Sequence, residues 1–365
     1  MKKTDRTWFI NNRPFISARA KGELRRVDKS FNLTKPSRRI KTIGTSHIIE
    51  APPLLSIYNF NANNDNAIYR QTMAFRDKLK KHLNGKSVFI DFSNTKELTA
   101  AALLMLFATA DSNRSKTNIA SIIWSKSKSV NALLKQSNFH GMLAGKNDHK
   151  PLKDVRGLPV ISGVGRDRAE EILDFVKQRF YGSKMDGNTE HLYGDAVTET
   201  VNNVGRHAYP DKDALERKWW LLCDIINDNL YLAIFDLGVG IPKTVVERRW
   251  FLRLAGEMYP DKCSTEMIGS VKHQQNAKLI IRYSIPDEEL IHLSMKGDVT
   301  GTQKPQHGQG SKSIKALVSE TVGGKLWVFS NKGLLTYETE DEPPKLNKLP
   351  ISIGGTLIQW NIKIS

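Results

Sequence analysis

Glu199 and Asn203 are a carboxylate and a carboxamide four residues apart. In a helix, side chains at i and i+4 project from one face, and His207 would continue the same stripe. An amide oxygen can bind Mg²⁺, which keeps several waters while it bridges phosphates. A carboxylate beside it could orient or deprotonate a nucleophile that attacks a phosphoryl group. Alone the pair is a weak signal, because most such pairs belong to the solvated face of a helix.

Asp236 ends an apolar strand and is followed by two glycines, Gly238 and Gly240. At the end of a strand, this carboxylate could accept a hydrogen bond from an adenine amino group. The two glycines would allow the backbone to approach a ligand closely. The alternative interpretation is an ordinary Asp-x-Gly turn after a strand.

Two further glycine-containing segments follow. Gly308 and Gly310 precede an amphipathic helix, whose free N–H groups and positive dipole end would favour a phosphate. A Walker-type phosphate loop is not predicted, because a preceding buried strand and the required glycine–lysine spacing are both missing. Thr356 opens the final strand, where its hydroxyl could reach an adenine through Asp236 or a water.

The elements that must position these residues alternate between strands and helices, which is typical of the α/β class. Apolar residues at helical spacing predict helices, and short apolar runs between turn residues predict strands. The predicted helices are 67–83, 98–110, 129–136, 166–180, 195–207 and 245–258. The predicted strands are 44–57, 87–92, 119–124, 219–226, 231–236, 321–328, 334–338 and 354–360, with a hairpin turn at 227–229.

The first half of the chain resembles a STAS domain, the fold of anti-sigma-factor antagonists. The resemblance rests on Val-Phe-Ile-Asp-Phe-Ser at 88–93, on the small-residue helix start eight positions after Asp91, and on residues 130–139. Phosphorylatable members carry Asp-Ser-Ser-Gly where this chain has Thr-Ala-Ala-Ala at 99–102. The resemblance therefore implies a docking module that contacts a protein partner, and not a phosphoacceptor.

The second half resembles the GHKL ATPase superfamily of gyrase and histidine kinases, and is closest to anti-sigma-factor serine kinases. The resemblance rests on the four segments around Asn203, Asp236, Gly310 and Thr356, in that order. It implies a two-layer α+β sandwich that binds ATP with Mg²⁺, and homodimerisation is a further expectation of the superfamily. The implied roles are catalytic carboxylate for Glu199, Mg²⁺ ligand for Asn203, adenine partner for Asp236, and nucleotide contacts for Gly238, Gly240, Gly308, Gly310 and Thr356.

One departure is the length of the segment between the second and third motifs. Residues 243–307 would form a longer lid than compact anti-sigma kinases have. Its predicted helix carries Arg248, Arg249 and Arg253, one of which could reach the phosphates on lid closure. The alternative is that these arginines solvate the lid surface.

Composition adds the remaining expectations. The net charge of +17 is concentrated in a basic extension, residues 1–43, with Trp8, Phe9, Phe15 and Phe31 among its charges. Such an arm suits nucleic acid, or it is a solubilising extension. Two cysteines exclude a disulfide framework, and neither a signal segment nor a run of about 20 apolar residues is seen. We expect a cytoplasmic protein with no membrane segment.

The expected organisation is the basic extension, a STAS-like domain at 44–150, a linker at 151–157 and a GHKL domain at 158–365. The leading function is a regulatory ATP-binding protein with slow, Mg²⁺-dependent turnover, in which lid closure is the switch. One alternative is a serine/threonine kinase of the partner-switching type that acts on a separate protein. Another is a nucleic-acid-associated effector or sensor whose assembly ATP controls.

Overall fold

The computed structural model confirms a mixed α/β protein. The basic extension, apart from its last three residues, lies outside the part of the chain that the structure describes, and so does the linker at 151–157. The described residues are 41–43, 46–58, 66–83, 88–114, 120–145, 160–165, 168–182, 184–226, 229–263, 274–300, 310–321, 323–339 and 342–363.

A seven-stranded sheet forms the centre of the molecule, with strand order β12-β11-β10-β13-β9-β8-β7 and every neighbouring pair antiparallel. The predicted hairpin is present, because Ile226 and Asn229 pair at the end of the first two long strands. Two strands of this sheet were not predicted, namely β7, which comes first in the chain, and the short edge strand β12. The strands are β7 (Ile161–Val164), β8 (Lys218–Ile226), β9 (Asn229–Asp236), β10 (Lys325–Ser330), β11 (Gly333–Tyr337), β12 (Lys345–Lys348) and β13 (Thr356–Lys363).

The helices α6 (Ala169–Phe180), α7 (Gly187–Asn203) and α13 (Gly310–Ser319) cover one face of this sheet, and Ile291 and Met295 of a further helix, α12 (Asp287–Thr300), join the same core. Successive side chains of a strand point to opposite faces, so alternate residues of β9 serve different layers. Leu230, Leu232 and Ile234 belong to the core shared with these helices. The intervening Ala233 and Phe235 belong to a second core on the opposite face.

That opposite face packs against the N-terminal region. Its four-stranded sheet has the order β1-β2-β4-β6, in which β2, β4 and β6 are parallel and β1 is antiparallel to β2. A separate short pair, β3 and β5, is also parallel. The elements are β1 (Lys41–Ile43), β2 (Ser46–Glu50), β3 (Leu54–Leu55), α2 (Ala67–His82), β4 (Val88–Asp91), β5 (Glu97–Leu98), α3 (Ala100–Asn113), β6 (Ala120–Ile123), α4 (Lys128–Gln136) and α5 (Phe139–Leu143).

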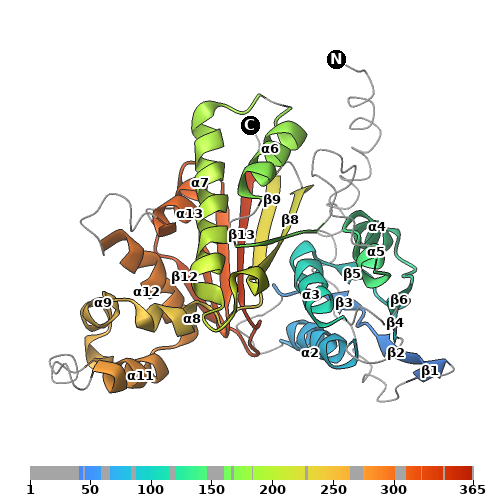
Figure 1. The fold of residues 1–365 in the computed structure, drawn as a ribbon, viewed down its shortest axis with the longest axis horizontal. Helices are drawn as coiled ribbons and strands as arrows, with labels where there is room; N and C mark the ends of the chain where they lie inside the picture. The colour runs from blue at the N-terminus through green and yellow to red at the C-terminus, as the bar shows by residue number, and fades with distance from the viewer. Residues whose placement is uncertain are drawn as a thin grey trace.

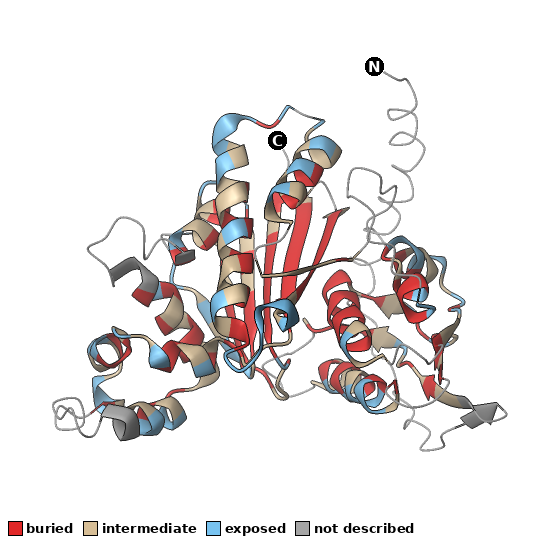
Figure 2. Ribbon diagram, in the orientation of Figure 1, coloured by how far each residue is buried: buried red, intermediate tan, exposed pale blue. Residues whose placement is uncertain are grey.

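Helix α3 is the middle of this contact. It is apolar on all sides, and every residue from Ala100 to Ala110 is buried, as expected for a helix enclosed by protein. The Thr99 hydroxyl caps it by accepting a hydrogen bond from the Ala102 N–H at 3.3 Å. Trp220 of β8 shares the core of this helix, and its indole N–H donates to Asp111 at 3.0 Å. Figures 1 and 2 show the buried sheet between the N-terminal helices and α6 and α7.

The segment predicted as a lid is a helical unit with its own core, in which Phe251 and Leu290 are fully buried. The predicted helix at 245–258 is wrong in one respect, because it is broken at Arg248, whose backbone is extended. The unit also contains a well-formed helix at its end that was not predicted. Its helices are α8 (Ile241–Thr244), η4 (Val245–Glu247), α9 (Phe251–Met258), η5 (Pro260–Lys262), α11 (Gln274–Ser284) and α12 (Asp287–Thr300). No helix in the described ranges has both the length and the apolar character to cross a membrane.

Candidate functional site

Helix α7 carries the predicted carboxylate and carboxamide, Glu199 and Asn203. Asp186 caps its first turn by accepting the Thr189 N–H at 3.0 Å, and the helix then continues without interruption through Glu199 to Asn203. The two side chains therefore share one helical face, as predicted. Both are partly exposed and are reachable from solvent.

The helix changes character directly after Asn203. Residues Val204–Ala208 form a π-helical turn, η2, so the backbone hydrogen bonds skip one more residue than in an α-helix. His207 therefore lies in this π-turn and not in the α-helical stretch that carries Glu199 and Asn203. Such turns occur often at functional sites, because they redirect a helix end without breaking it.

The second half of the candidate site lies at the end of the central sheet. Asp236 of β9 and Thr356 of β13 stand opposite each other in register. Ser330 of β10 is opposite Thr356 on its other side, and the two hydroxyl groups are 3.0 Å apart. By strand alternation, these three residues face the helical layer. Each stands at the end of a row of side chains that is otherwise apolar, as Leu232 and Ile234 are on β9. A buried polar cluster therefore closes the core at this edge.

Asp236 is 5% exposed. Its Oδ1 accepts the Gly238 N–H at 2.7 Å, which fixes the turn after the strand. Burial raises the pKa of Asp236 to about 7, although hydrogen bonds from the Gly238 and Thr356 backbone lower it. The carboxyl group is therefore poised to change protonation near neutral pH.

Backbone contacts join the two halves. The Val239 N–H donates to the Ala208 carbonyl at 2.8 Å, and the Leu237 N–H donates to the Tyr209 hydroxyl at 2.8 Å. The turn after Asp236 is thereby attached to the end of the π-turn that begins next to Asn203. The structure thus brings the first two predicted motifs together in one place.

The glycines of the Asp236 turn are required by the protein itself. A Cβ at Gly238 would overlap the Ala208 carbonyl oxygen. Gly240 has φ +87°, and a Cβ there would collide with the side chain of Asn331, which donates to the Val239 carbonyl at 3.0 Å. The sequence interpretation gave both glycines to a ligand, whereas the structure shows close approach to neighbouring protein atoms.

The third motif is described only in part. Gly308 lies outside the described residues, and Gly310 is the first residue of α13. The next residue, Ser311, is 2% exposed, and its Oγ has no hydrogen-bond partner among the residues described. Sequence reasoning did not select Ser311, although a hydroxyl following Gly-Gln-Gly was visible. An unsatisfied buried hydroxyl at a helix start is a candidate ligand contact.

Of the three arginines in the predicted lid, Arg248 affects the pKa of His207, the last residue of the predicted stripe. Burial is the main cause that lowers the pKa of His207 to about 4, and the positive charges of Arg248 and Arg206 lower it further. Arg253 instead pairs with Glu257 at 2.7 Å on the exposed face of α9. His207 is therefore neutral at physiological pH and faces a cationic lid residue.

A groove of about 450 Å³ lies between α6 and α7, next to the predicted stripe and not on it. Its lining includes Thr198 and Asn202, and the Asn202 Oδ1 is buried without a hydrogen-bond partner among the described residues. This groove contains none of the predicted site residues.

Metal binding at this site would depend on a bound phosphate-containing molecule. In the described ranges, no three His, Cys, Asp or Glu side chains gather as a metal site. Asn203 supplies a single amide oxygen, which suits Mg²⁺ only if phosphate oxygens and waters complete the coordination. No protein-family model matches this chain, and no curated protein matches it either.

Proposed function

We propose that this chain is a regulatory protein that binds ATP with Mg²⁺ and turns it over slowly. In this proposal residues 158–365 are a GHKL-type ATPase domain and residues 44–150 are a STAS-like docking domain. The observation that carries the proposal is the pairing of Asp236 with Thr356 at the polar edge of the helix-facing core. This pair is joined through backbone contacts to the end of the helix that bears Asn203.

The base side of the proposed pocket is the polar cluster. The Asp236 carboxylate would accept a hydrogen bond from the adenine amino group, and the Thr356 hydroxyl would contact the ring directly or through a water. Both groups are buried, so their interactions with a bound base would not be weakened by competing solvent. Guanine carries a carbonyl where adenine carries the amino donor, so the same pair would discriminate against it.

The phosphate side is formed by two helices. Asn203 would hold Mg²⁺, which neutralises phosphate charge when bound, and Glu199 would orient or deprotonate the attacking nucleophile. The α13 N-terminus, beginning at Gly310, would present N–H groups and the unsatisfied Ser311 hydroxyl to a phosphate. Arg248 would add a positive charge from the lid.

The architecture agrees with this proposal. The central sheet with α6, α7 and α13 on one face forms two layers, which is the arrangement expected for a GHKL domain. The other face of the sheet contacts the N-terminal region, so that any signal received there meets the ATPase sheet directly.

Equilibrium ATP binding, measured by calorimetry with and without Mg²⁺, tests the function. We expect binding at micromolar to millimolar ATP that requires Asp236 and that Mg²⁺ strengthens. An absence of binding at millimolar ATP would refute the proposal, and so would wild-type affinity, with Mg²⁺ present, in both the Asn203→Ala and the Asp236→Ala variants.

A second candidate function is nucleic-acid association. Trp124 is 38% exposed at the carboxyl end of β6, and the Lys135 amino group lies 5.1 Å from its ring centroid. The His140 ring lies beside it with centroids 5.8 Å apart, and Lys126 and Lys128 are exposed nearby in the sequence. An exposed aromatic ring among cations suits base stacking next to a phosphate backbone. Oligonucleotide binding by Trp124 variants, described below, tests this candidate.

A further inference from the structure

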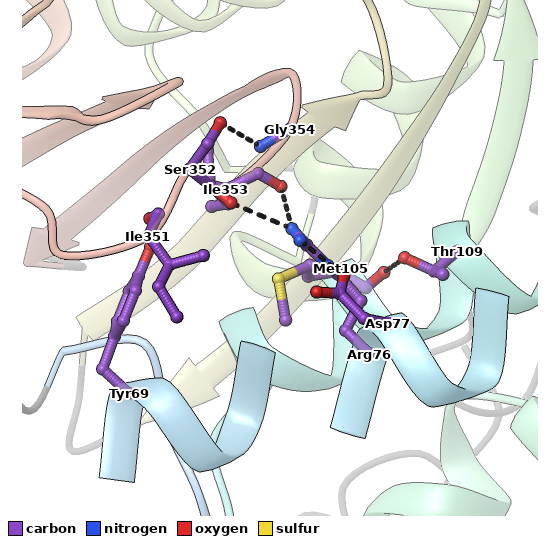
Figure 3. Close-up of polar contacts among 9 residues, drawn as sticks. All are labelled: Tyr69, Arg76, Asp77, Met105, Thr109, Ile351, Ser352, Ile353 and Gly354. Carbon is purple, nitrogen blue, oxygen red and sulfur yellow. Dashed lines mark hydrogen bonds and ion pairs between the residues drawn. The ribbon is translucent and has the colours of Figure 1, made fainter. Parts of the chain in front are cut away.

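The loop between β12 and β13 is held by helix α2 of the N-terminal region. The Tyr69 hydroxyl donates to the Ile351 carbonyl at 2.8 Å. The Arg76 Nη1 donates to the Ser352 carbonyl at 3.3 Å and also to the Ile353 carbonyl. Two side chains of one helix thus bind three consecutive carbonyl groups, as Figure 3 shows.

Arg76 is fixed in this position. Its side chain is 13% exposed, and its Nε and Nη2 both donate to Asp77 Oδ1, at 3.1 and 2.8 Å. The guanidinium group therefore uses one edge for a carboxylate and its remaining nitrogen for the loop. A lysine has no such fork, so it could not make both sets of contacts at once.

The other end of the same loop forms one wall of the proposed adenine pocket. Gly355 directly precedes Thr356, and a Cβ on it would overlap the Asp236 carbonyl oxygen. The Gly355 carbonyl accepts the Ser330 hydroxyl at 3.3 Å and the Asn331 N–H at 3.2 Å. A single residue, Gly354, separates Ile353, whose carbonyl Arg76 binds, from Gly355, which lies against the Asp236 carbonyl oxygen.

The loop has few internal restraints of its own. Gly354 and Gly355 have φ +71° and +124°, backbone conformations that are open to glycine and permit the loop to adopt other paths. Ile353 is fully buried in the core shared with the N-terminal region. The path of the loop therefore depends on its contacts with α2 and with the turn at Asn331.

We propose that Arg76 and Tyr69 are positioning residues for the adenine pocket, through which the N-terminal region controls nucleotide affinity. This inference rests on the proposed ATP function. A partner that binds the N-terminal region and shifts α2 would move the loop, and with it Thr356 relative to Asp236. By linkage, bound nucleotide would change the affinity for that partner by the same factor.

The test combines hydrogen exchange with nucleotide binding in the full-length chain. Arg76→Gln removes the charge and the fork, and Tyr69→Phe removes only the hydroxyl that holds Ile351. Arg70→Gln is the matched control, because Arg70 is an exposed arginine on the same helix. Amide exchange over residues 351–357 reports the loop without any nucleotide, and exchange in β8 reports global stability.

We expect Arg76→Gln to accelerate exchange in the loop and to weaken both ATP and ADP binding about tenfold, the equivalent of one charge-assisted hydrogen bond. Tyr69→Phe should give a smaller change of the same kind, and Arg70→Gln should change neither quantity. Equal losses for ATP and ADP are expected because the loop contacts the base side and not the γ-phosphate.

Two results would overturn the inference. One is unchanged loop exchange in both Arg76→Gln and Tyr69→Phe. The other is faster loop exchange with unaltered ATP affinity, which would make the contact purely structural. Failure of the wild-type chain to bind ATP would instead refute the proposed function itself, so the two failures are distinguishable. If Arg76→Gln does not fold, Tyr69→Phe decides by the same two criteria.

Discussion

Asp236 and Thr356 are cross-strand partners on β9 and β13, and both are buried on the helix-facing side of the sheet. They are 120 residues apart in the chain, and each follows the same alternation that buries Leu232 and Ile358 behind them. A polar pair at the end of two apolar rows costs free energy unless its groups are satisfied. Here the Gly238 N–H and the Ser330 hydroxyl satisfy part of their capacity, and a ligand could use the remainder.

Asp236→Asn should weaken ATP binding about tenfold and reduce the preference for ATP over GTP, since its one amide oxygen would stay with the Gly238 N–H and its amide nitrogen cannot accept from adenine. Thr356→Val should weaken ATP binding less. Competition calorimetry with both nucleotides measures the two effects. Thr336→Val on β11 is the matched control and should bind as wild type does. Unaltered base preference in Asp236→Asn would remove the carboxylate from the adenine pocket.

Substitutions on α7 should separate binding from turnover. Asn203→Ala should abolish the strengthening of ATP binding by Mg²⁺, because the amide ligand is lost. Glu199→Gln should bind ATP normally but hydrolyse it about 100-fold more slowly, as expected for a general base. Phosphate release and calorimetry provide the two measurements, with Thr198→Ala on the exposed face of the same helix as control. A Glu199→Gln variant with wild-type turnover would rule out the catalytic role.

The pH dependence of stability should contain two opposing contributions. The pKa of Asp236 is raised to about 7 by burial, so the folded state holds that proton more tightly, and stability falls as pH rises from about 4 to about 7. The pKa of His207 is lowered to about 4 by burial, Arg248 and Arg206, so stability rises with pH between about 4 and 6.5.

Asp236→Asn should therefore remove the Asp236 contribution, so that only that of His207 remains. The free energy of unfolding should then rise more steeply from about pH 4 to about pH 6.5 than in wild type. His207→Gln should have the opposite effect, a decrease from about pH 4 to about pH 7. Urea unfolding across this range measures both slopes. Identical slopes in all three proteins would show that neither group has a displaced pKa.

Gly355→Ala should destabilise the fold by about 1–3 kcal/mol, because φ +124° strains any residue with a Cβ and this Cβ would meet the Asp236 carbonyl oxygen. Gly187→Ala is the control, since a Cβ there would meet nothing within 4 Å. Urea midpoints and slopes give the comparison. Equal stability of the two variants would mean that the loop relaxes away from Asp236 at no cost.

The surface around Trp124 should bind single-stranded oligonucleotides if the second candidate function holds. Trp124→Ala should weaken binding about tenfold, the effect of losing one stacked base, and Lys135→Gln should lower its dependence on salt. Fluorescence anisotropy of a labelled oligonucleotide in the full chain is the measurement. A Lys80→Gln, Lys81→Gln double variant on α2 controls for charge. Unchanged binding in Trp124→Ala would leave this surface without a nucleic-acid role.

Most individual elements were predictable because their signals are local. The apolar spacing of residues 67–83 gave α2 within one residue, and the hairpin at 227–229 follows from turn residues between two strong strands. The elements that were missed have weak local patterns. The edge strand β12 reads Lys-Leu-Asn-Lys and is held by pairing with β11, and α12 has little apolar asymmetry because it contacts several elements.

The residue types of the candidate site were predictable from the sequence, but the contacts that bring them together were not. The i, i+4 spacing of Glu199 and Asn203 is a helical property, so the sequence alone placed them on one face. The π-turn that contains His207 is accompanied by tertiary contacts, such as the hydrogen bond from the Arg217 guanidinium to the Gly205 carbonyl. Local spacing carries no information about such contacts.

The sequence by itself determined the class of the elements, the stripe on α7 and the polar residues at the strand ends, because hydrophobic periodicity and turn chemistry act over a few residues. Tertiary structure alone decided that Thr356 faces Asp236, that Gly238 and Gly240 accommodate protein atoms, and that Arg76 holds the loop before β13. These relationships join residues that are at least 30 positions apart in the chain, and up to 277 positions apart for Arg76 and Ile353. They arise from strand register and layer packing, which depend on how the whole chain buries its apolar surface.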